Sequence, residues 1–119
     1  MAWLFLDTHE NGRVRYAWRE QDGRVLKEVE KEGRASLLLP LIAKDLGKFK
    51  ITGIAVVNGP GSFSAVRGGV LDANLMARLL KVPLVAFAAG ETFDPGRLPS
   101  EYVAPVYDAE PNITIPKKA

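Results

Sequence analysis

Hydrophobic and polar residues follow a strand-like pattern in the first third of the chain. The run Ala2–Asp7 is apolar up to its final carboxylate and predicts a buried strand. In segment 13–20 apolar and basic residues alternate, and this period of two predicts a strand with one solvent-exposed face. Segment 25–32 continues as a third, more polar strand. Because short Asn-Gly and Asp-Gly turn signals separate the three segments, we expect an antiparallel meander.

The period of the apolar positions changes from Arg34 onward. Segment 36–49 predicts a helix, with Ser36 as its N-cap and Gly47 as its C-terminal stop. Pro40 lies at or just beyond the first turn of this helix. Because proline costs a hydrogen bond beyond the first turn, we expect the helix to begin near Pro40 or to kink there.

A strand, a second helix and a last strand follow. Segment 50–57 is β-branched and almost uncharged, which predicts a buried strand. Segment 64–80 predicts the second helix, and segment 82–87 another short buried strand. Because strand–helix–strand connections are right-handed and pair their strands in parallel, the complete pattern predicts an α/β fold with a mixed five-stranded sheet.

The composition changes after Ala88. Segment 89–119 contains five of the eight prolines and predicts an extended tail. We therefore expect one folded unit over residues 1–88 and a proline-rich tail over residues 89–119. The sequence leaves open whether the tail covers part of the sheet.

Length, charge and cysteine content restrict the classes of function. A chain of 119 residues with 47% hydrophobic residues is typical of one soluble domain. The 16 basic and 14 acidic residues are interleaved, so the net charge of +2 is weak support for direct nucleic-acid binding. The absence of cysteine excludes disulfides and thiolate metal sites. No apolar run is long enough to span a membrane and no signal pattern opens the chain, so we expect a cytoplasmic protein.

The stretch VVNGPGSFSAVRGG, residues 56–69, raises the question of a phosphate-binding loop. A glycine loop before a helix N-terminus suits anions. However, the Walker pattern is absent, and the dinucleotide fingerprint fails because Ser64 stands where its third glycine belongs. A tight turn with Ser62 or Ser64 capping the helix is the main interpretation, while nucleotide binding stays open as an alternative.

Other polar residues offer weak support for catalysis. Asp7 and Thr8, at the end of the first strand, suit a metal or phosphate corner but also an ordinary turn. His9, the single histidine, stands beside Glu10 on an expected loop. No nucleophile–base pair is recognisable, and we expect no catalytic residue, cofactor or metal. Five further acidic residues are expected on exposed faces and form no obvious pair: Glu28, Glu30, Glu32, Asp45 and Asp72.

The second helix has two apolar stripes, although covering a sheet requires only one. At 100° per residue, the sheet-facing stripe is Val66, Val70, Ala73, Ala77 and Leu80. The first helix has a similar excess of leucines, and exposed apolar stripes on neighbouring helices are typical of a protein–protein interface. Burial under the protein's own tail is the alternative. The predicted interface is Leu38, Ile42, Gly68, Gly69, Leu71, Leu75 and Leu79, where the two glycines would allow a partner helix to approach closely.

The segment GPGSFSAVRGGVLDANLMARLLKVPLVAF resembles the signature of the TsaB (YeaZ) family, in which a GPGSFTGLRIG-type loop opens the second helix. LFLDT resembles the family's opening strand, RASLLLPLI its entry to the first helix, and APVYDAEPNITIPKK its C-terminal tail. The residues that match the family's motifs are Asp7, Thr8, Gly59, Pro60, Gly61, Ser62, Phe63, Ser64 and Arg67. Ser64 replaces the usual Thr and keeps a hydroxyl at that position.

This resemblance implies an actin-like (ribonuclease H-like) lobe with a non-catalytic role. TsaB proteins pair with the related TsaD subunit, or with themselves, through the first two helices. With the ATPase TsaE they support transfer of threonylcarbamoyl to the tRNA adenosine that becomes t6A37. Family members usually carry a second actin-like domain, and here we expect that lobe to be absent. A single lobe cannot close a nucleotide cleft, and contacts of the missing lobe with TsaE or tRNA are in doubt.

Together these observations predict a one-lobe TsaB-like scaffold for tRNA threonylcarbamoylation. Its partner would be a TsaD-like subunit, with a TsaE-like ATPase in the same machinery, tRNA contacted only indirectly and no membrane. A homodimer is expected for the isolated chain. The alternatives are a degenerate nucleotide or small-molecule binding domain, using Asp7, Thr8 and the loop 59–64, and a stand-alone homodimer. A peptidase function is discounted because the sequence has no HExxH motif.

Overall fold

The computed structural model consists of one sheet with helices on one side. The described residues are 2–10, 12–45, 47–61, 63–91, 93–94, 97–100 and 102–104. Five strands form the sheet: β1 (Ala2–Asp7), β2 (Arg13–Arg19), β3 (Val25–Glu32), β4 (Ile51–Val57) and β5 (Leu84–Phe87). The helical elements are the 3-10 turn η1 (Ala35–Leu37), the short helix α1 (Leu38–Ala43) and the long helix α2 (Phe63–Leu80).

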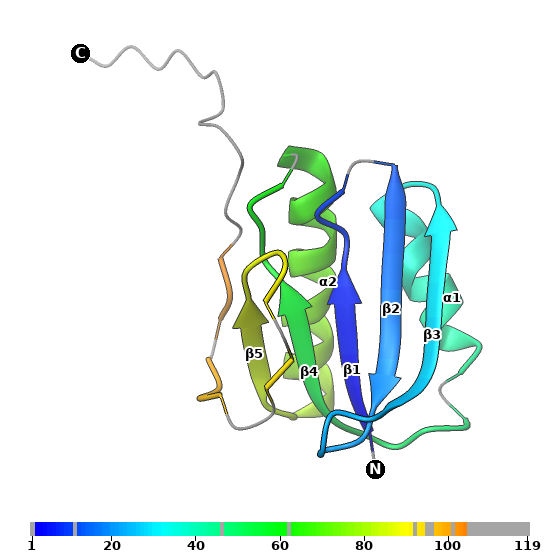
Figure 1. Ribbon diagram of the computed structural model, residues 1–119, viewed down its shortest axis with the longest axis vertical. Coiled ribbons are helices and arrows are strands. Elements are labelled where there is room, and N and C mark those ends of the chain that lie inside the picture. The colour runs from blue at the N-terminus through cyan, green and yellow to red at the C-terminus, as the bar shows by residue number, and fades with distance from the viewer. Residues whose placement is uncertain are drawn as a thin grey trace.

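The strands lie in the order β3-β2-β1-β4-β5 (Figure 1). β2 pairs antiparallel with both β1 and β3, whereas β4 pairs in parallel with both β1 and β5. The predicted meander and the predicted parallel half are therefore both confirmed, and with them the α/β fold class. In this register Asp7, at the end of central strand β1, lies opposite Arg15 of β2 and Val57 of β4.

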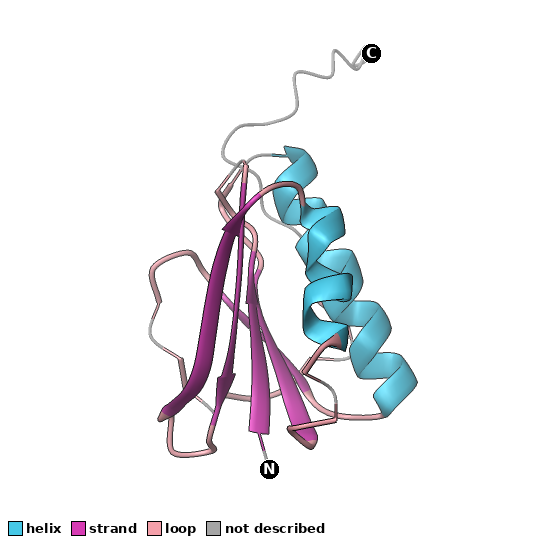
Figure 2. Ribbon diagram, turned by 90° about the vertical axis from the view of Figure 1, so that its right-hand side faces the viewer, coloured by secondary structure: helices cyan, strands magenta, loops and turns pink. Residues whose placement is uncertain are grey.

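The helices cover one face of the sheet and leave the other face without helices (Figure 2). The main core lies between the sheet and α2, because alternate strand residues such as Leu4 and Ile54 meet the inner residues of α2, including Val66 and Val70. A smaller core lies on the opposite, helix-free face and includes Trp3, Ala55, Val85 and Phe87, with Phe5 and Phe93 packed against it. Among the described residues, no helix has the length and apolar character that a membrane crossing requires.

The first helix departs from its predicted boundaries. Ser36 lies inside η1 and caps nothing, since α1 begins after Leu37 with no side-chain hydrogen bond at its N-cap. Pro40 is the third residue of α1, where its missing N–H would have had no partner within the helix. Gly47 is not the helix stop, because α1 ends at Ala43. The chain turns there, and Asp45 enters the interior beside β2.

The second helix and its sheet-facing stripe agree with the prediction. The helix occupies Phe63–Leu80, and four of the five residues assigned to its inner face are buried: Val66, Val70, Ala73 and Ala77. Leu80, in the last turn, is 48% exposed. The predicted caps cannot be assigned, because Ser62 and the side chain of Ser64 lie outside the described residues.

The described part of segment 89–119 packs on the lobe. Ser100 forms an antiparallel bridge with Leu84 of β5. Val103 is buried, and its backbone N–H and C=O both bond with the amide side chain of Asn74 on α2. On the other face of the sheet, Phe93 contacts the ring of Trp3 with a centroid distance of 5.9 Å. These residues therefore contribute to both cores, whereas residues 105–119 lie outside the described part.

Candidate functional site

The motif residues at the end of β1 hold the start of α2 in place. Thr8 is 1% exposed, and its hydroxyl donates a hydrogen bond of 2.6 Å to the carbonyl of Ala65, in the first turn of α2. A Cβ on Gly69 would clash with the Thr8 side chain, and a Cβ on Gly61 would clash with the backbone of His9. Glycine is therefore required at both positions for the helix to pack this closely on β1.

The glycine loop is also fixed to the end of β5. Gly59 adopts a φ of 116°, a conformation that L side chains rarely adopt, and its carbonyl accepts a 2.7 Å hydrogen bond from the N–H of Ala89. The neighbouring Asn58 donates from its backbone N–H to the carbonyl of Phe87, at 3.0 Å. These contacts favour the tight-turn interpretation of the loop, because the backbone at its start is hydrogen-bonded to the end of β5 and the residues just after it.

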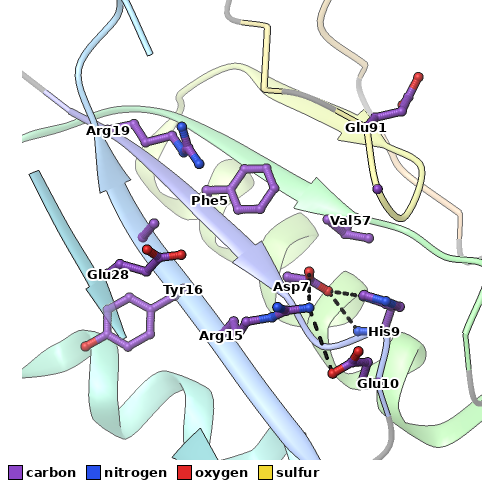
Figure 3. Close-up of a pocket in the computed structure, with 12 residues that line it drawn as sticks. Phe5, Asp7, His9, Glu10, Arg15, Tyr16, Arg19, Glu28, Val57 and Glu91 are labelled. Carbon is purple, nitrogen blue, oxygen red and sulfur yellow. Dashed lines mark hydrogen bonds and ion pairs between the residues drawn. The ribbon is translucent and has the colours of Figure 1, made fainter. Parts of the chain in front are cut away.

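The carboxylate of Asp7 is engaged by its neighbours (Figure 3). One oxygen accepts hydrogen bonds from the backbone N–H of His9 at 3.0 Å and from its ring Nδ1 at 2.6 Å, provided that this nitrogen carries the proton. The other oxygen accepts from Arg15, with 3.3 Å between Nη2 and Oδ2. Arg15 also approaches Glu10 at 3.9 Å. Of the two interpretations of Asp7, the local one agrees with the structure, where its carboxylate is hydrogen-bonded to neighbouring residues.

A shallow hollow of about 390 Å³ lies beside this network on the helix-free face. Its lining carries both signs of charge, with Asp7, Glu10, Glu28 and Glu91 against Arg15 and Arg19. Such a mixed lining has no surplus of positive charge to attract a polyphosphate. Within the described ranges, no group of three or more His, Cys, Asp or Glu side chains could hold a metal ion.

A buried carboxylate that the sequence did not reveal lies under the helical layer. Asp45 is 1% exposed, and it accepts hydrogen bonds from the hydroxyl of Tyr16 at 2.9 Å, the indole of Trp18 at 3.2 Å and the ammonium of Lys27 at 2.6 Å. The prediction of an exposed, unpaired Asp45 is therefore wrong. Its partners lie on β2 and β3, 18 to 29 residues away in sequence, where no local pattern could identify them.

The Asp45 cluster changes the ionisation of its members. Burial opposes the charged form of Asp45, but the hydrogen bonds from Lys27, Tyr16 and Trp18 outweigh it and lower the pKa of this carboxyl. Burial, together with the hydrogen bond to Asp45, raises the pKa of Tyr16 to about 12. The cluster ties the turn after α1 to the sheet.

The outward face of α2 carries most of the predicted interface. Leu71 and Leu75 are each 51% exposed, Leu79 is 69% exposed, and Gly68 is partly exposed. We call these four residues the α2 stripe. The motif residue Arg67 is also exposed. The structure therefore leaves this second apolar surface of the helix uncovered by the described part of the tail.

Three members of the predicted interface are corrected by the structure. Leu38 and Ile42 are 0% and 1% exposed and belong to the protein's own core. Gly69 is buried against Thr8 and not available to a partner helix. The exposed leucines near the first helix are instead Leu37, the last residue of η1, and Leu39. For Gly69 a signal existed, since it follows the buried Val66 by three residues.

Known proteins match the segment that contains the glycine loop and share the fold of this lobe. Residues 35–91, which run from η1 to just beyond β5, match the family model described as TsaD: tRNA N6-adenosine threonylcarbamoyltransferase. A structure described as YeaZ from Pseudomonas aeruginosa superimposes with a TM-score of 0.63 at 26% identity. A second Pseudomonas aeruginosa structure, described as an uncharacterized protein with similarity to peptidase YEAZ, gives the same values.

The structural matches cover only part of the matched proteins. They cover 73% of this chain but only 42% and 43% of the two Pseudomonas chains, so the chain spans less than half their length. A ROK family protein from Streptococcus pneumoniae TIGR4, solved in complex with sucrose, matches with a TM-score of 0.51 and 16% identity, over 74% of this chain and 34% of its own. At that identity the likeness concerns the fold alone. No curated protein matches the chain.

The two kinds of comparison agree with the motifs. The family match contains the glycine loop and both helical segments, and the ROK protein shares the fold. Both Pseudomonas structures pair that fold with a YeaZ description. The resemblance of this chain to the TsaB (YeaZ) family, predicted from its sequence, is thereby confirmed.

Proposed function

We propose that the chain is a non-catalytic, TsaB-type subunit of the machinery that makes N6-threonylcarbamoyladenosine in tRNA. In this proposal its α2 stripe docks a TsaD-like subunit. The similarity to YeaZ and the match to the TsaD family model support a role in this modification. The observation that carries the docking proposal is the exposure of Leu71, Leu75 and Leu79 along a helix whose inner face is already buried.

The condition of the motif residues supports the non-catalytic part of the proposal. Thr8, Gly61 and Gly69 serve packing between β1 and α2. Asp7 is engaged by His9 and Arg15, so that among the described residues it is not a free carboxylate available as a base or a ligand. The contacts of these motif residues lie within the lobe itself, which supports a structural role for them.

The wider assembly follows from the same proposal. A TsaE-like ATPase would act in the same pathway, and tRNA would be contacted through the TsaD-like subunit, since the charges of this chain are interleaved and not gathered into a basic patch. The place of action would be the cytoplasm, where such a modification takes place. We extend the proposal only to the lobe itself, residues 1–88, together with the described residues that pack on it.

Leu75→Glu tests the docking surface. A carboxylate at the centre of an apolar interface is strongly unfavourable, so we expect affinity for the TsaD-like subunit of the same organism to fall by roughly tenfold or more. Leu26→Glu is the matched control, because Leu26 is 39% exposed on β3, at the far edge of the sheet, and should leave affinity unchanged. Binding is measured by co-purification and calorimetry, and folding by circular dichroism. Full binding by a folded Leu75→Glu variant would remove the interface assignment.

The hollow beside Asp7 favours one other candidate, a small-molecule or nucleotide binding domain. Its mixed charge and the engagement of Asp7 make it the weaker of the two. Calorimetry with ATP and ADP separates them: we expect no binding tighter than about 100 μM, roughly −5.5 kcal/mol. Tighter binding that Arg15→Ala removes would establish the hollow as a ligand site.

A further inference from the structure

One carboxylate borders the α2 stripe without a partner of its own. Asp72 is half-buried, and it takes part in no hydrogen bond or ion pair among the described residues. Three and four residues away on the same helix stand Gly68, Gly69, Leu75 and Met76, none of which can compensate its charge. Partial burial raises the pKa of Asp72 to about 6.

The elements packed against α2 supply no charge to Asp72. The secondary-structure elements among them are β1, β4, β5 and η1, and the last three contain no charged residue. The described tail residues 102–104 also contact α2, through Val103, and contain no Asp, Glu, Lys, Arg or His. The one charged residue of β1, Asp7, is engaged by His9 and Arg15. α1 is also uncharged, although the exposed Arg34 and Lys44 flank η1 and α1. On α2 itself, Arg67 and Arg78 project from the opposite flank of the stripe at 100° per residue.

An apolar partner surface would therefore remove water from an uncompensated carboxylate. Burying a charge without a counter-charge opposes association, whereas a hydrogen-bonded cation reverses that penalty. A second copy of this chain is a poor partner for the same reason. In an antiparallel two-fold pairing each flank of a helix meets the same flank of its copy, so that two Asp72 side chains approach each other.

We propose that Asp72 selects the occupant of the α2 stripe, favouring a partner that presents an arginine or lysine to it over a second copy of the chain. This inference rests on the proposed function and specifies the chemistry of its partner. An arginine suits the position best, since its guanidinium is weakly hydrated and pairs with a carboxylate through two hydrogen bonds.

The two associations then respond to pH in opposite directions. Pairing with a cation lowers the pKa of Asp72 in the complex, so partner binding weakens as the pH falls through and below about 6. Self-association strengthens over the same interval, because a protonated Asp72 can enter an apolar contact without charge repulsion. Partner binding and self-association are therefore separable by measurements at pH 7.5 and pH 5.

The test combines two variants with a charge-matched control. With the TsaD-like subunit as the probe, we expect affinity at pH 7.5 to fall about tenfold or more for Asp72→Asn and further for Asp72→Lys. Glu32→Gln, which makes the same charge change at the exposed end of β3, should stay within twofold of the wild type. Light scattering should show more dimer for Asp72→Asn than for the wild type at pH 7.5, and more wild-type dimer at pH 5.

The possible failures are distinguishable. Affinity of Asp72→Asn within twofold of the wild type, with no gain in self-association, overturns the role of Asp72 and leaves the proposed function intact. If the wild type does not bind the TsaD-like subunit, the proposed function is wrong. The proposal that Asp72 selects this partner is then wrong as well. Circular dichroism of each variant ensures that a lost interaction is not a lost fold.

Discussion

The inner and outer sides of the helical layer differ in whether their carboxylates have hydrogen-bond partners. On the inner side, Asp45 is almost inaccessible to solvent, yet three side chains from two strands donate hydrogen bonds to it. On the outer side, Asp72 is only half-buried but has no partner within the described residues. The contrast indicates that the inner carboxylate is satisfied by the lobe itself, whereas the outer one lies beside the exposed leucines of the proposed docking surface.

Removal of the Asp45 carboxylate should destabilise the lobe more than a change at Gly69 or Asp72. Asp45→Ala leaves the hydroxyl of Tyr16 and the indole N–H of Trp18 buried with poorer partners, and it deprives Lys27 of its counter-charge. We expect the free energy of unfolding to fall by about 3 kcal/mol. Urea unfolding at pH 7 measures it, and Glu32→Ala is the exposed control. A loss below about 1 kcal/mol would contradict the view that the inner side depends on this cluster.

The pH dependence of Asp45 gives an independent check on the same cluster. Because its pKa is lowered in the folded state, its contribution is complete above the usual value of 3.8 and is lost as the pH falls through the folded value. The wild type should therefore lose more stability than Asp45→Ala between pH 5 and pH 2. Parallel stability curves for the two proteins over that interval would show that the cluster does not stabilise the charged form.

Gly69→Ala tests the close packing of the inner side. The added methyl group would meet the side chain of Thr8, and overpacking of a tight core costs about 1–3 kcal/mol, so we expect a loss of about 2 kcal/mol. Gly47→Ala is the matched control, because a Cβ there would meet no atom within 4 Å. Thermal and urea unfolding of both variants measure the difference. If Gly69→Ala and Gly47→Ala were equally stable, α2 could move away from β1 to accept the methyl group without loss of stability.

The sequence predicted the parts of the molecule whose pattern repeats over many residues. The antiparallel meander, the parallel half of the sheet and the two-sided character of α2 follow from dense periodicity, and the structure agrees with all three. In α1 the same approach failed, since leucines at nearly every position leave the phase undetermined. In the structure Leu38 and Ile42 are buried, whereas Leu37 and Leu39 are exposed. Leu37 belongs to the 3-10 turn that precedes α1.

The only part of the candidate site that could be predicted is the part set by residue spacing along α2. The exposure of Leu71, Leu75 and Leu79 could be worked out from their spacing, and it agrees with the structure. The engagement of Asp7 by Arg15 and the burial of Asp45 depend on which residues the strand pairing brings together. Such contacts join positions that are not neighbours in sequence, so no local sequence pattern predicts them.

Asp72→Asn should give the smallest effect and the opposite sign from Asp45. The pKa of Asp72 is raised from 3.8 to about 6 by burial, so this carboxyl favours the folded state fully below pH 3.8 and loses that contribution as the pH rises through about 6. At pH 7 the ionised group therefore opposes folding, and replacing it with the neutral amide should stabilise the isolated chain. Because the side chain is still partly solvated, we expect a gain below about 1 kcal/mol.

The difference between Asp72→Asn and the wild type should disappear near pH 4, where the wild-type carboxyl approaches its neutral form. Urea unfolding at the two pH values measures it, at protein concentrations low enough to prevent self-association. A destabilising Asp72→Asn would mean that the isolated lobe supplies a partner for this carboxylate, and the outer side would then resemble the inner one. Asp72→Asn could instead both stabilise the isolated chain and weaken partner binding. In that case the charged Asp72 lowers the stability of the free lobe, and pairing with a cation of the partner removes this destabilisation. Such a residue serves recognition and not folding.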